Sequence, residues 1–240
     1  MRQQITDRAH AEGLLQCRRR LAADDTVQAC LEAQRRHAPS LEILPDALAD
    51  IVERVTRIIA GRAGSLPLDV PDAGTRPTSD RVREALFSAL ESTDAVRDAR
   101  VLDLYAGTGA LGLEAISRGA ASADLVEKAP RAAAVARKNA DRVTRALGGA
   151  AAVRVHRASV DAFLRTATGP FDLVFIDPPY DLTDDALATT LALVAPLVGE
   201  DADVIVERAK RSTAPVLPDR LAPTRSRTYG DTTLWWSSTT

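Results

Sequence analysis

The chain has 240 residues, 45% of them hydrophobic and 27% charged, which is typical of a soluble globular domain with room for an appendage. It contains no apolar run long enough to cross a bilayer and no apolar secretory signal, so we expect a cytoplasmic protein without membrane contact. A formal charge of −2 excludes a protein-wide basic field for nucleic acid. Cys17 and Cys30 form neither a disulfide framework nor a CxxC pair, and we expect no metal.

The first 54 residues differ from the rest and have the pattern of two helices joined by a loop. Leu14, Leu15 and Leu21 give a partial helical stripe, but no residues there have the spacing of a ligand site. We therefore predict a helical extension over residues 1–54, which is either an appendage or sequence outside the native protein.

A short element is predicted ahead of the main domain. The runs RIIAG (57–61) and LPLDV (66–70) indicate two short strands of a ribbon. In TRPTSDRVREALFSALES (75–92), Thr78 or Ser79 can cap a helix. Its apolar residues fall on one face: Val82, Leu86, Phe87 and Leu90.

From about residue 100 onward, strand-like and helix-like segments alternate. Five apolar strands are predicted at 101–105, 123–128, 152–158, 171–177 and 202–208. Helical patterns of about 10 to 19 residues separate them, which indicates a parallel sheet with helices on both faces. The tail RSRTYGDTTLWWSS predicts a hairpin that turns at Gly230 and Asp231.

A glycine-rich loop follows the first of these strands. Gly107, Gly109 and Gly112 match GxGxxG, the fingerprint of dinucleotide-binding folds. Asp103 comes four residues before Gly107, and we expect it at the mouth of the loop. There it would repel a pyrophosphate brought to the helix N-terminus, yet it complements the cationic amino group and sulfonium of S-adenosylmethionine, which carries no phosphate. Glu127, at the end of the next strand, is placed to accept hydrogen bonds from a ribose. The loop therefore favours S-adenosylmethionine over a nicotinamide dinucleotide.

The most specific motif is Asp-Pro-Pro-Tyr, residues 177–180, at the end of an apolar strand. Two prolines stop the strand and hold Asp177 and Tyr180 at the carboxyl edge of the sheet, where open α/β folds bind ligands. A rigid acceptor beside an aromatic ring suits a planar base with an exocyclic amine. The ring would stack on the base, while Asp177 and the Pro178 carbonyl accept the two N–H bonds. Such a site works by positioning and needs neither a metal nor a covalent nucleophile.

Four motifs together resemble one family: DLYAGTGALGLEAISRGA, VEK, DPPY and RPTSDRVREALF. They are similar to the bacterial 16S ribosomal RNA guanine-N2 methyltransferases, the enzymes that modify guanine(966). RPTSDRVREALF and the terminal YGDTTLWW narrow the resemblance, which covers about residues 56–237. It implies a class I, Rossmann-like fold with seven strands, mostly parallel with an antiparallel last strand. It also implies an S-adenosylmethionine cofactor and 16S rRNA or the 30S particle as partner.

By position, the resemblance also implies roles for individual residues. The methionine part, ribose and adenine of the cofactor would be bound by Asp103, Tyr105, Gly107, Gly109, Glu127, Lys128 and Ser159. The target guanine and the catalysis would fall to Asp177, Pro178, Pro179 and Tyr180. The candidate RNA contacts are Arg62, Arg76, Thr78, Arg81 and Arg83, with help from Arg208, Lys210 and Arg211 because the ribbon has few basic residues.

The resemblance divides the chain into three parts. Residues 1–54 are the helical extension, residues 55–94 the element at the RNA and cofactor entrance, and residues 95–240 the catalytic domain. Family members start just before the RIIAG-like strand, where Val55 stands in this chain, so we hypothesise that residues 1–54 come from an upstream start assignment. We expect a monomer.

Other functions remain open from the residues alone. An adenine-N6 methyltransferase acting on DNA or RNA would share the DPPY turn. A glutamine methyltransferase would prefer Asn at position 177. An NAD-dependent oxidoreductase would use the glycine loop but leaves Asp103 and DPPY unexplained, and a non-enzymatic RNA-binding protein would not need an intact cofactor loop.

Overall fold

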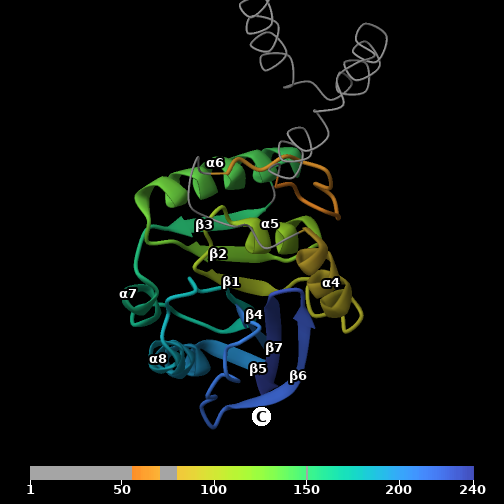
Figure 1. Cartoon of the computed structure of the whole chain (residues 1–240). Helices are drawn as coiled ribbons and strands as arrows, with labels where there is room; N and C mark the ends of the chain where they lie inside the picture. The colour runs from red at the N-terminus through yellow and green to blue at the C-terminus, as the bar shows by residue number, and fades with distance from the viewer. Residues whose placement is uncertain (1–55, 71–79, 150) are drawn as a thin grey trace, which may run out of the picture. The chain divides into compact units, whose positions relative to one another are not determined.

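The computed structural model describes residues 56–70, 80–149 and 151–240 (Figure 1). The predicted extension over residues 1–54, the capping residues Thr78 and Ser79, and the candidate RNA contact Arg76 lie outside the described residues. Within these described ranges, no helix combines the length and the apolar character that crossing a bilayer requires.

A seven-stranded sheet organises the fold, in the order β3-β2-β1-β4-β5-β7-β6. Its strands are β1 (Arg100–Leu104), β2 (Ser122–Val126), β3 (Ala152–His156), β4 (Phe171–Ile176), β5 (Val198–Ala209), β6 (Leu221–Tyr229) and β7 (Thr232–Thr239). The first five pair in parallel, whereas β7 runs antiparallel to both β5 and β6. The predicted sheet with an antiparallel last strand is confirmed. Because the strand order reverses between β1 and β4, ligands are expected at the carboxyl ends of these two strands.

Helices cover both faces of the sheet (Figure 1). On one face lie α4 (Asp80–Glu91), α5 (Ala110–Ser117) and α6 (Pro130–Ala146), and on the other α7 (Val160–Leu164) and α8 (Asp184–Val194). The predicted apolar face of α4 is buried, and the rings of Phe87 and Phe175 lie 5.6 Å apart. Strand residues alternate between the two cores, as the pleat requires: Val101 packs on the α4–α6 side and Leu102 on the α7–α8 side.

The predicted ribbon is much shorter than the sequence indicates. Only Arg57 and Pro67 form an antiparallel bridge within the described part of this element, flanked by backbone hydrogen bonds such as Ile58 N–H to Leu66 O at 2.9 Å. The two predicted strands do not extend further because the chain turns onto α5. There the N–H groups of Ile59 and Ala60 donate to the Glu114 carboxylate, at 2.7 and 3.0 Å, instead of to a partner strand.

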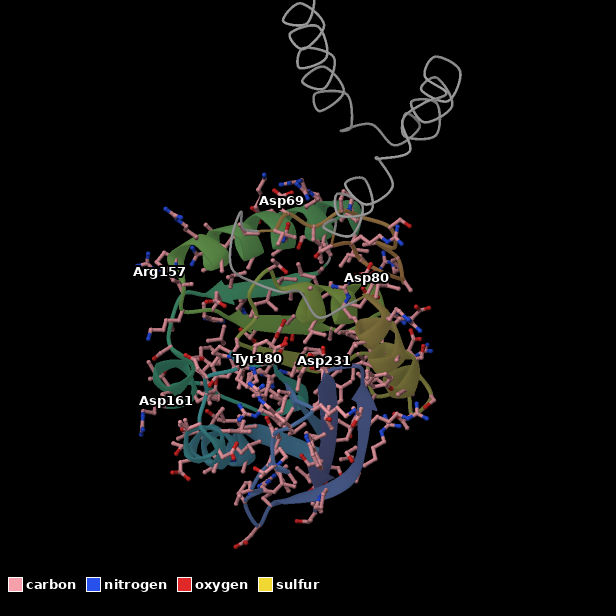
Figure 2. All side chains as sticks on the ribbon, in the orientation of Figure 1. Asp69, Asp80, Arg157, Asp161, Tyr180 and Asp231 are labelled. Carbon is pink, nitrogen blue, oxygen red and sulfur yellow. The ribbon has the colours of Figure 1, made fainter. Side chains whose placement is uncertain are left out.

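Asn139 on α6 ties this N-terminal element to the glycine loop. Its buried amide oxygen accepts from the Asp69 N–H at 2.9 Å, and its nitrogen donates to the carbonyls of Asp69 and Thr108, both at 3.0 Å. Asp69 also pairs with Lys138 and Arg142 on α6, which lowers its pKa, and Figure 2 shows it beside that helix. The element is therefore joined to the predicted cofactor loop through Asn139.

Candidate active site

The glycine loop has an unusual backbone where it leaves β1. Tyr105 lies in the left-handed region with φ 63°, as do Gly107 at 54° and Gly109 at 81°. Aromatic residues rarely adopt this conformation, and strain of this kind concentrates at functional sites. The Tyr105 hydroxyl lies 3.4 Å from Thr190 Oγ1 on α8, and burial raises its pKa. Its side chain therefore supports the loop from the α8 side.

The three glycines of the motif have different roles. A Cβ on Gly109 or Gly112 would lie 2.9 or 2.2 Å from side-chain carbons of Leu125, so these two let α5 pack closely on β2. A Cβ on Gly107 would meet nothing nearer than the Tyr105 carbonyl oxygen at 4.0 Å. The loop is thus open at Gly107, where a ligand can approach the backbone.

Asp103 lies beneath the loop rather than at its mouth. Its carboxylate is 1% exposed and accepts a hydrogen bond from the Gly112 N–H at 2.9 Å. Burial raises its pKa to about 7, against the lowering effect of the Gly112 bond and with a further rise from the charge of Glu127. The structure therefore assigns Asp103 a structural bond to α5, and its contact with a cofactor stays a prediction.

Replacing Asp103 by asparagine is expected to reduce the pH dependence of stability. An unfolded aspartate ionises near pH 4, so between about pH 4 and 7 the folded state holds a proton that the unfolded state has lost. Stability therefore falls as pH rises through this window, by about 2–3 kcal/mol between pH 5 and 8. Asp103→Asn keeps an acceptor for Gly112 but cannot ionise. Urea unfolding at both pH values should show the smaller fall in the variant, and equal falls would contradict this assignment.

Glu127 joins the glycine loop to the start of α6. One carboxylate oxygen accepts from the Gly107 N–H at 3.0 Å and the other from the Ala129 N–H at 2.6 Å. The side chain is half-buried at the end of β2, and Lys128 next to it is exposed. Each carboxylate oxygen has a second lone pair with which it can accept a ligand hydroxyl.

Ser159 acts as the N-cap of α7, because its hydroxyl oxygen accepts from the Ala162 N–H at 3.3 Å. Beside it lies a cluster that was not predicted. His156 Nε2 is 2.6 Å from Asp124 Oδ1, and the ring packs 4.6 Å from the ring of Phe163. A sequence signal for this cluster exists: Asp124 lies two residues before Val126 on β2, so both side chains point to the α7 side of the sheet.

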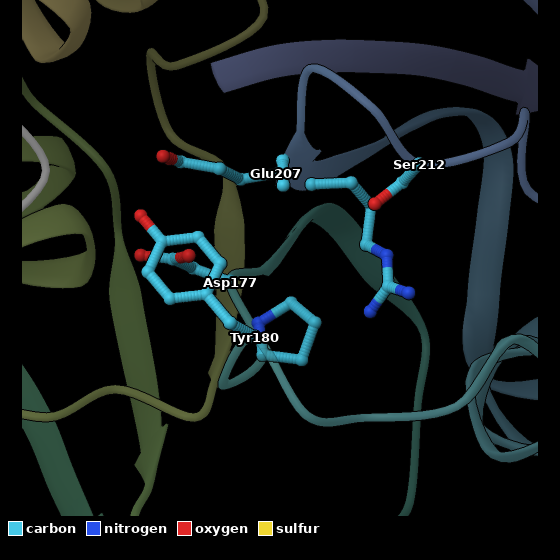
Figure 3. Close-up of a pocket in the computed structure, with 7 residues that line it drawn as sticks. Asp177, Tyr180, Glu207 and Ser212 are labelled. Carbon is cyan, nitrogen blue, oxygen red and sulfur yellow. The ribbon is translucent and has the colours of Figure 1, made fainter. Parts of the chain in front are cut away.

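The DPPY turn presents an aromatic ring to solvent. The Tyr180 side chain is 67% exposed, Pro179 is also exposed, Pro178 is buried and Asp177 is half-buried. A small hollow of about 10 Å³ lies behind the turn, and Figure 3 draws the residues that line it: Asp177, Pro178, Tyr180, Glu207, Arg208, Ala209 and Ser212. A large exposed ring beside a half-buried carboxylate can hold a flat, amine-bearing base.

Two arginines predicted to contact RNA are buried, which corrects those assignments. Arg83 is 1% exposed because it lies on the same helical face as Phe87, and its guanidinium donates to the Arg57 carbonyl and pairs with Asp80 at 2.9 Å. Arg208 is 8% exposed and donates to the Leu182 carbonyl. It therefore holds the segment after DPPY against β5.

The remaining candidate RNA contacts are either exposed or outside the described residues. Arg62 and Arg81 are exposed, as are Lys210 and Arg211, whereas Arg76 and Thr78 lie outside the described residues. The part of the chain that the structure describes also contains no group of three or more His, Cys, Asp or Glu side chains that could hold a metal ion.

Comparison with known proteins decides the family. Residues 56–238 match the family described as conserved hypothetical protein 95. This chain belongs to that family. One relative of this chain is ribosomal RNA small subunit methyltransferase D of Escherichia coli. The two are 37% identical over 177 residues, which cover 72% of this chain and 85% of that protein.

Solved structures agree with this family assignment. The structure titled "Putative methyltransferase yhhF from Escherichia coli" superposes with a TM-score of 0.64 at 34% identity, covering 77% of this chain and 97% of that chain. A hypothetical protein of Thermus thermophilus, TTHA0928, gives 0.63 at 34% identity, covering 76% and 98%. The predicted family and the predicted class I methyltransferase fold are therefore both confirmed for this chain.

Proposed function

We propose that this protein transfers a methyl group from S-adenosylmethionine to the exocyclic N2 of a guanine in 16S ribosomal RNA. The observation that carries the proposal is the DPPY turn, which holds an exposed Tyr180 and a half-buried Asp177 at the carboxyl end of β4, next to the glycine loop. The Escherichia coli relative, named as a small subunit rRNA methyltransferase, supports rRNA as the substrate.

The residues of the loop fit the proposed cofactor. Gly107 leaves room for a ligand against the backbone, and Glu127 offers two carboxylate oxygens to the two hydroxyls of a ribose. The half-buried Glu127 carboxylate beside Gly107 makes this edge of the sheet acidic, which favours a cation and disfavours a dinucleotide pyrophosphate. S-adenosylmethionine, when bound, supplies an electrophilic methyl group.

The acceptor half of the site works by orientation. The Asp177 carboxylate accepts one N–H of the amine and the Pro178 carbonyl accepts the other, which turns the nitrogen lone pair out of the plane of the base. The Tyr180 ring stacks on the base and fixes that plane. The amine loses one proton in the reaction, and Asp177 is the acceptor placed to receive it. Exposed Arg62 and Arg81 would contact RNA phosphates near this entrance.

Replacing Tyr180 by alanine is expected to weaken use of the RNA acceptor by about 1–3 kcal/mol, the value of one stacked base, which corresponds to roughly a 5- to 150-fold fall in kcat/KM. Tyr180→Phe keeps the ring and should stay close to wild type. Steady-state methyl transfer with RNA as the varied substrate measures the effect. An equal loss in both variants would contradict a stacking role and point to the hydroxyl.

The proposed function is tested by transfer of a tritiated methyl group to 30S particles, naked 16S RNA and duplex DNA. We expect incorporation into the ribosomal substrate and none into DNA, with cofactor binding seen by calorimetry. Incorporation into DNA would favour an adenine-N6 methyltransferase. The absence of both incorporation and cofactor binding would reject the proposal and favour a non-enzymatic RNA-binding protein.

A further inference from the structure

A second carboxylate, which was not among the predicted site residues, lies beside the DPPY turn. β4 and β5 pair in parallel with Ile176 opposite Val206, so Asp177 and Glu207 are the next residues on neighbouring strands. In both strands the alternation of the pleat directs these side chains to the α4 side of the sheet, the side on which Phe175 and Ile205 are buried. Both residues line the same hollow, and Figure 3 shows both side chains extending in the same direction.

The last strand holds Glu207 in place. The hydroxyl of Thr232 on β7 donates to Glu207 Oε1 at 3.0 Å, and Thr232 is buried. Thr232 belongs to the YGDTTLWW motif, to which the proposed methyl transfer assigns no role. Asp177 and Glu207 also line a second small pocket, whose other walls are apolar and include Leu86 on α4 and Leu111 on α5. A fixed carboxylate in an apolar wall is a strong and directional hydrogen-bond acceptor.

The acceptors in this hollow match the donors of one base. Guanine has three neighbouring N–H groups: N1–H and one N2–H on the Watson–Crick edge, and the second N2–H on the sugar edge. The site offers the Asp177 carboxylate, the Pro178 carbonyl and the Glu207 carboxylate, which are all acceptors. Adenine also has an amine, but its N1 is an acceptor. A carboxylate facing adenine N1 would bring two acceptors together, which is unfavourable in a partly desolvated site.

We propose that Glu207 accepts the N1–H of the target guanine and thereby selects guanine over adenine, with Thr232 as the residue that positions its carboxylate. The inference rests on the proposed function, because it assigns the specificity of the same site. It also explains how a DPPY turn, which suits any exocyclic amine, can be restricted to one base.

The test compares two RNA substrates that differ at the target base. Semi-synthetic 16S RNA carries either guanine or 2-aminopurine there; 2-aminopurine keeps the 2-amino group but has an unprotonated N1. We expect wild-type kcat/KM to be at least roughly 100-fold higher on guanine. Glu207→Gln should narrow this ratio at least roughly 10-fold, because an amide can present oxygen to N1–H or N–H to an unprotonated N1.

Two further variants keep the result interpretable. Thr232→Val removes the hydroxyl that positions Glu207 and should narrow the guanine to 2-aminopurine ratio of kcat/KM to a smaller extent. This variant keeps the proposal testable if Glu207→Gln folds poorly. Glu200→Gln, an exposed glutamate at the other end of β5, should leave the ratio unchanged. If Glu207→Gln and Thr232→Val each lowered kcat/KM equally on the guanine RNA and the 2-aminopurine RNA, the specificity role of Glu207 would be overturned, while the proposed function would stand. A wild-type protein that methylates neither RNA would instead contradict the proposed function.

Discussion

Replacing Asp177 by alanine is expected to lower methyl transfer by roughly 10²–10³-fold while leaving S-adenosylmethionine affinity near that of wild type. The carboxylate lies at the end of β4 and lines the acceptor hollow, whereas the proposed cofactor contacts lie on the loops after β1 and β2. Its loss removes the acceptor that orients the amine but none of the groups assigned to the cofactor.

Single-turnover transfer and calorimetric titration of the cofactor measure the two parts of this prediction separately. Asp177→Asn keeps one acceptor oxygen and should retain more activity than Asp177→Ala. Asp185→Ala, which removes an exposed aspartate in the first turn of α8, is the matched control and should stay close to wild type. If Asp177→Ala instead lost cofactor affinity but transferred the methyl group normally at saturating cofactor, Asp177 would belong to the cofactor site and not to the acceptor site.

The largest effect on stability is expected at Glu114. This fully buried carboxylate on α5 accepts from the N–H groups of Ile59 and Ala60 and from Arg118 Nε at 2.7 Å. Glu114→Ala leaves two backbone donors and a buried guanidinium without this partner. Breaking a buried pair on one side in this way costs about 3–5 kcal/mol of unfolding free energy.

Urea unfolding of Glu114→Ala and of a control measures this cost. Glu84→Ala removes an exposed glutamate from α4 and should change stability by less than about 0.5 kcal/mol. A change below about 1 kcal/mol in Glu114→Ala would mean that the N-terminal element is not anchored through this residue. The anchor also bears on function, because the same element reaches the glycine loop through Asn139.

Local patterns predicted the order of strands and helices from Asp80 onward because each element carries its own periodicity. The apolar face of α4 and the hairpin at Gly230 and Asp231 are examples, and both are present. The same spacing contained the evidence against Arg83 as an RNA contact, since residues 83, 87 and 90 share a helical face. The charge of Arg83 suggested a surface position, but its place on the apolar face of α4 buries it.

The rest of the site depends on contacts between distant segments. Asp103 follows the pleat of β1 to the α5 side, where Gly112 leaves space for it, and sequence order alone placed it at the mouth of the loop. Glu207 becomes a neighbour of Asp177 only because β5 lies next to β4, and Thr232 reaches it only because β7 inserts between β5 and β6. Strand order, which no local pattern contains, was required to find them.

The modified nucleoside tests the central claim most directly. RNA from 30S particles of a strain that lacks the protein is incubated with purified protein and S-adenosylmethionine, digested to nucleosides and analysed by mass spectrometry. Our account predicts one new N2-methylguanosine per 16S RNA, absent when Asp177→Ala is used instead. The appearance of N6-methyladenosine, or of no methylated nucleoside at all, would contradict it.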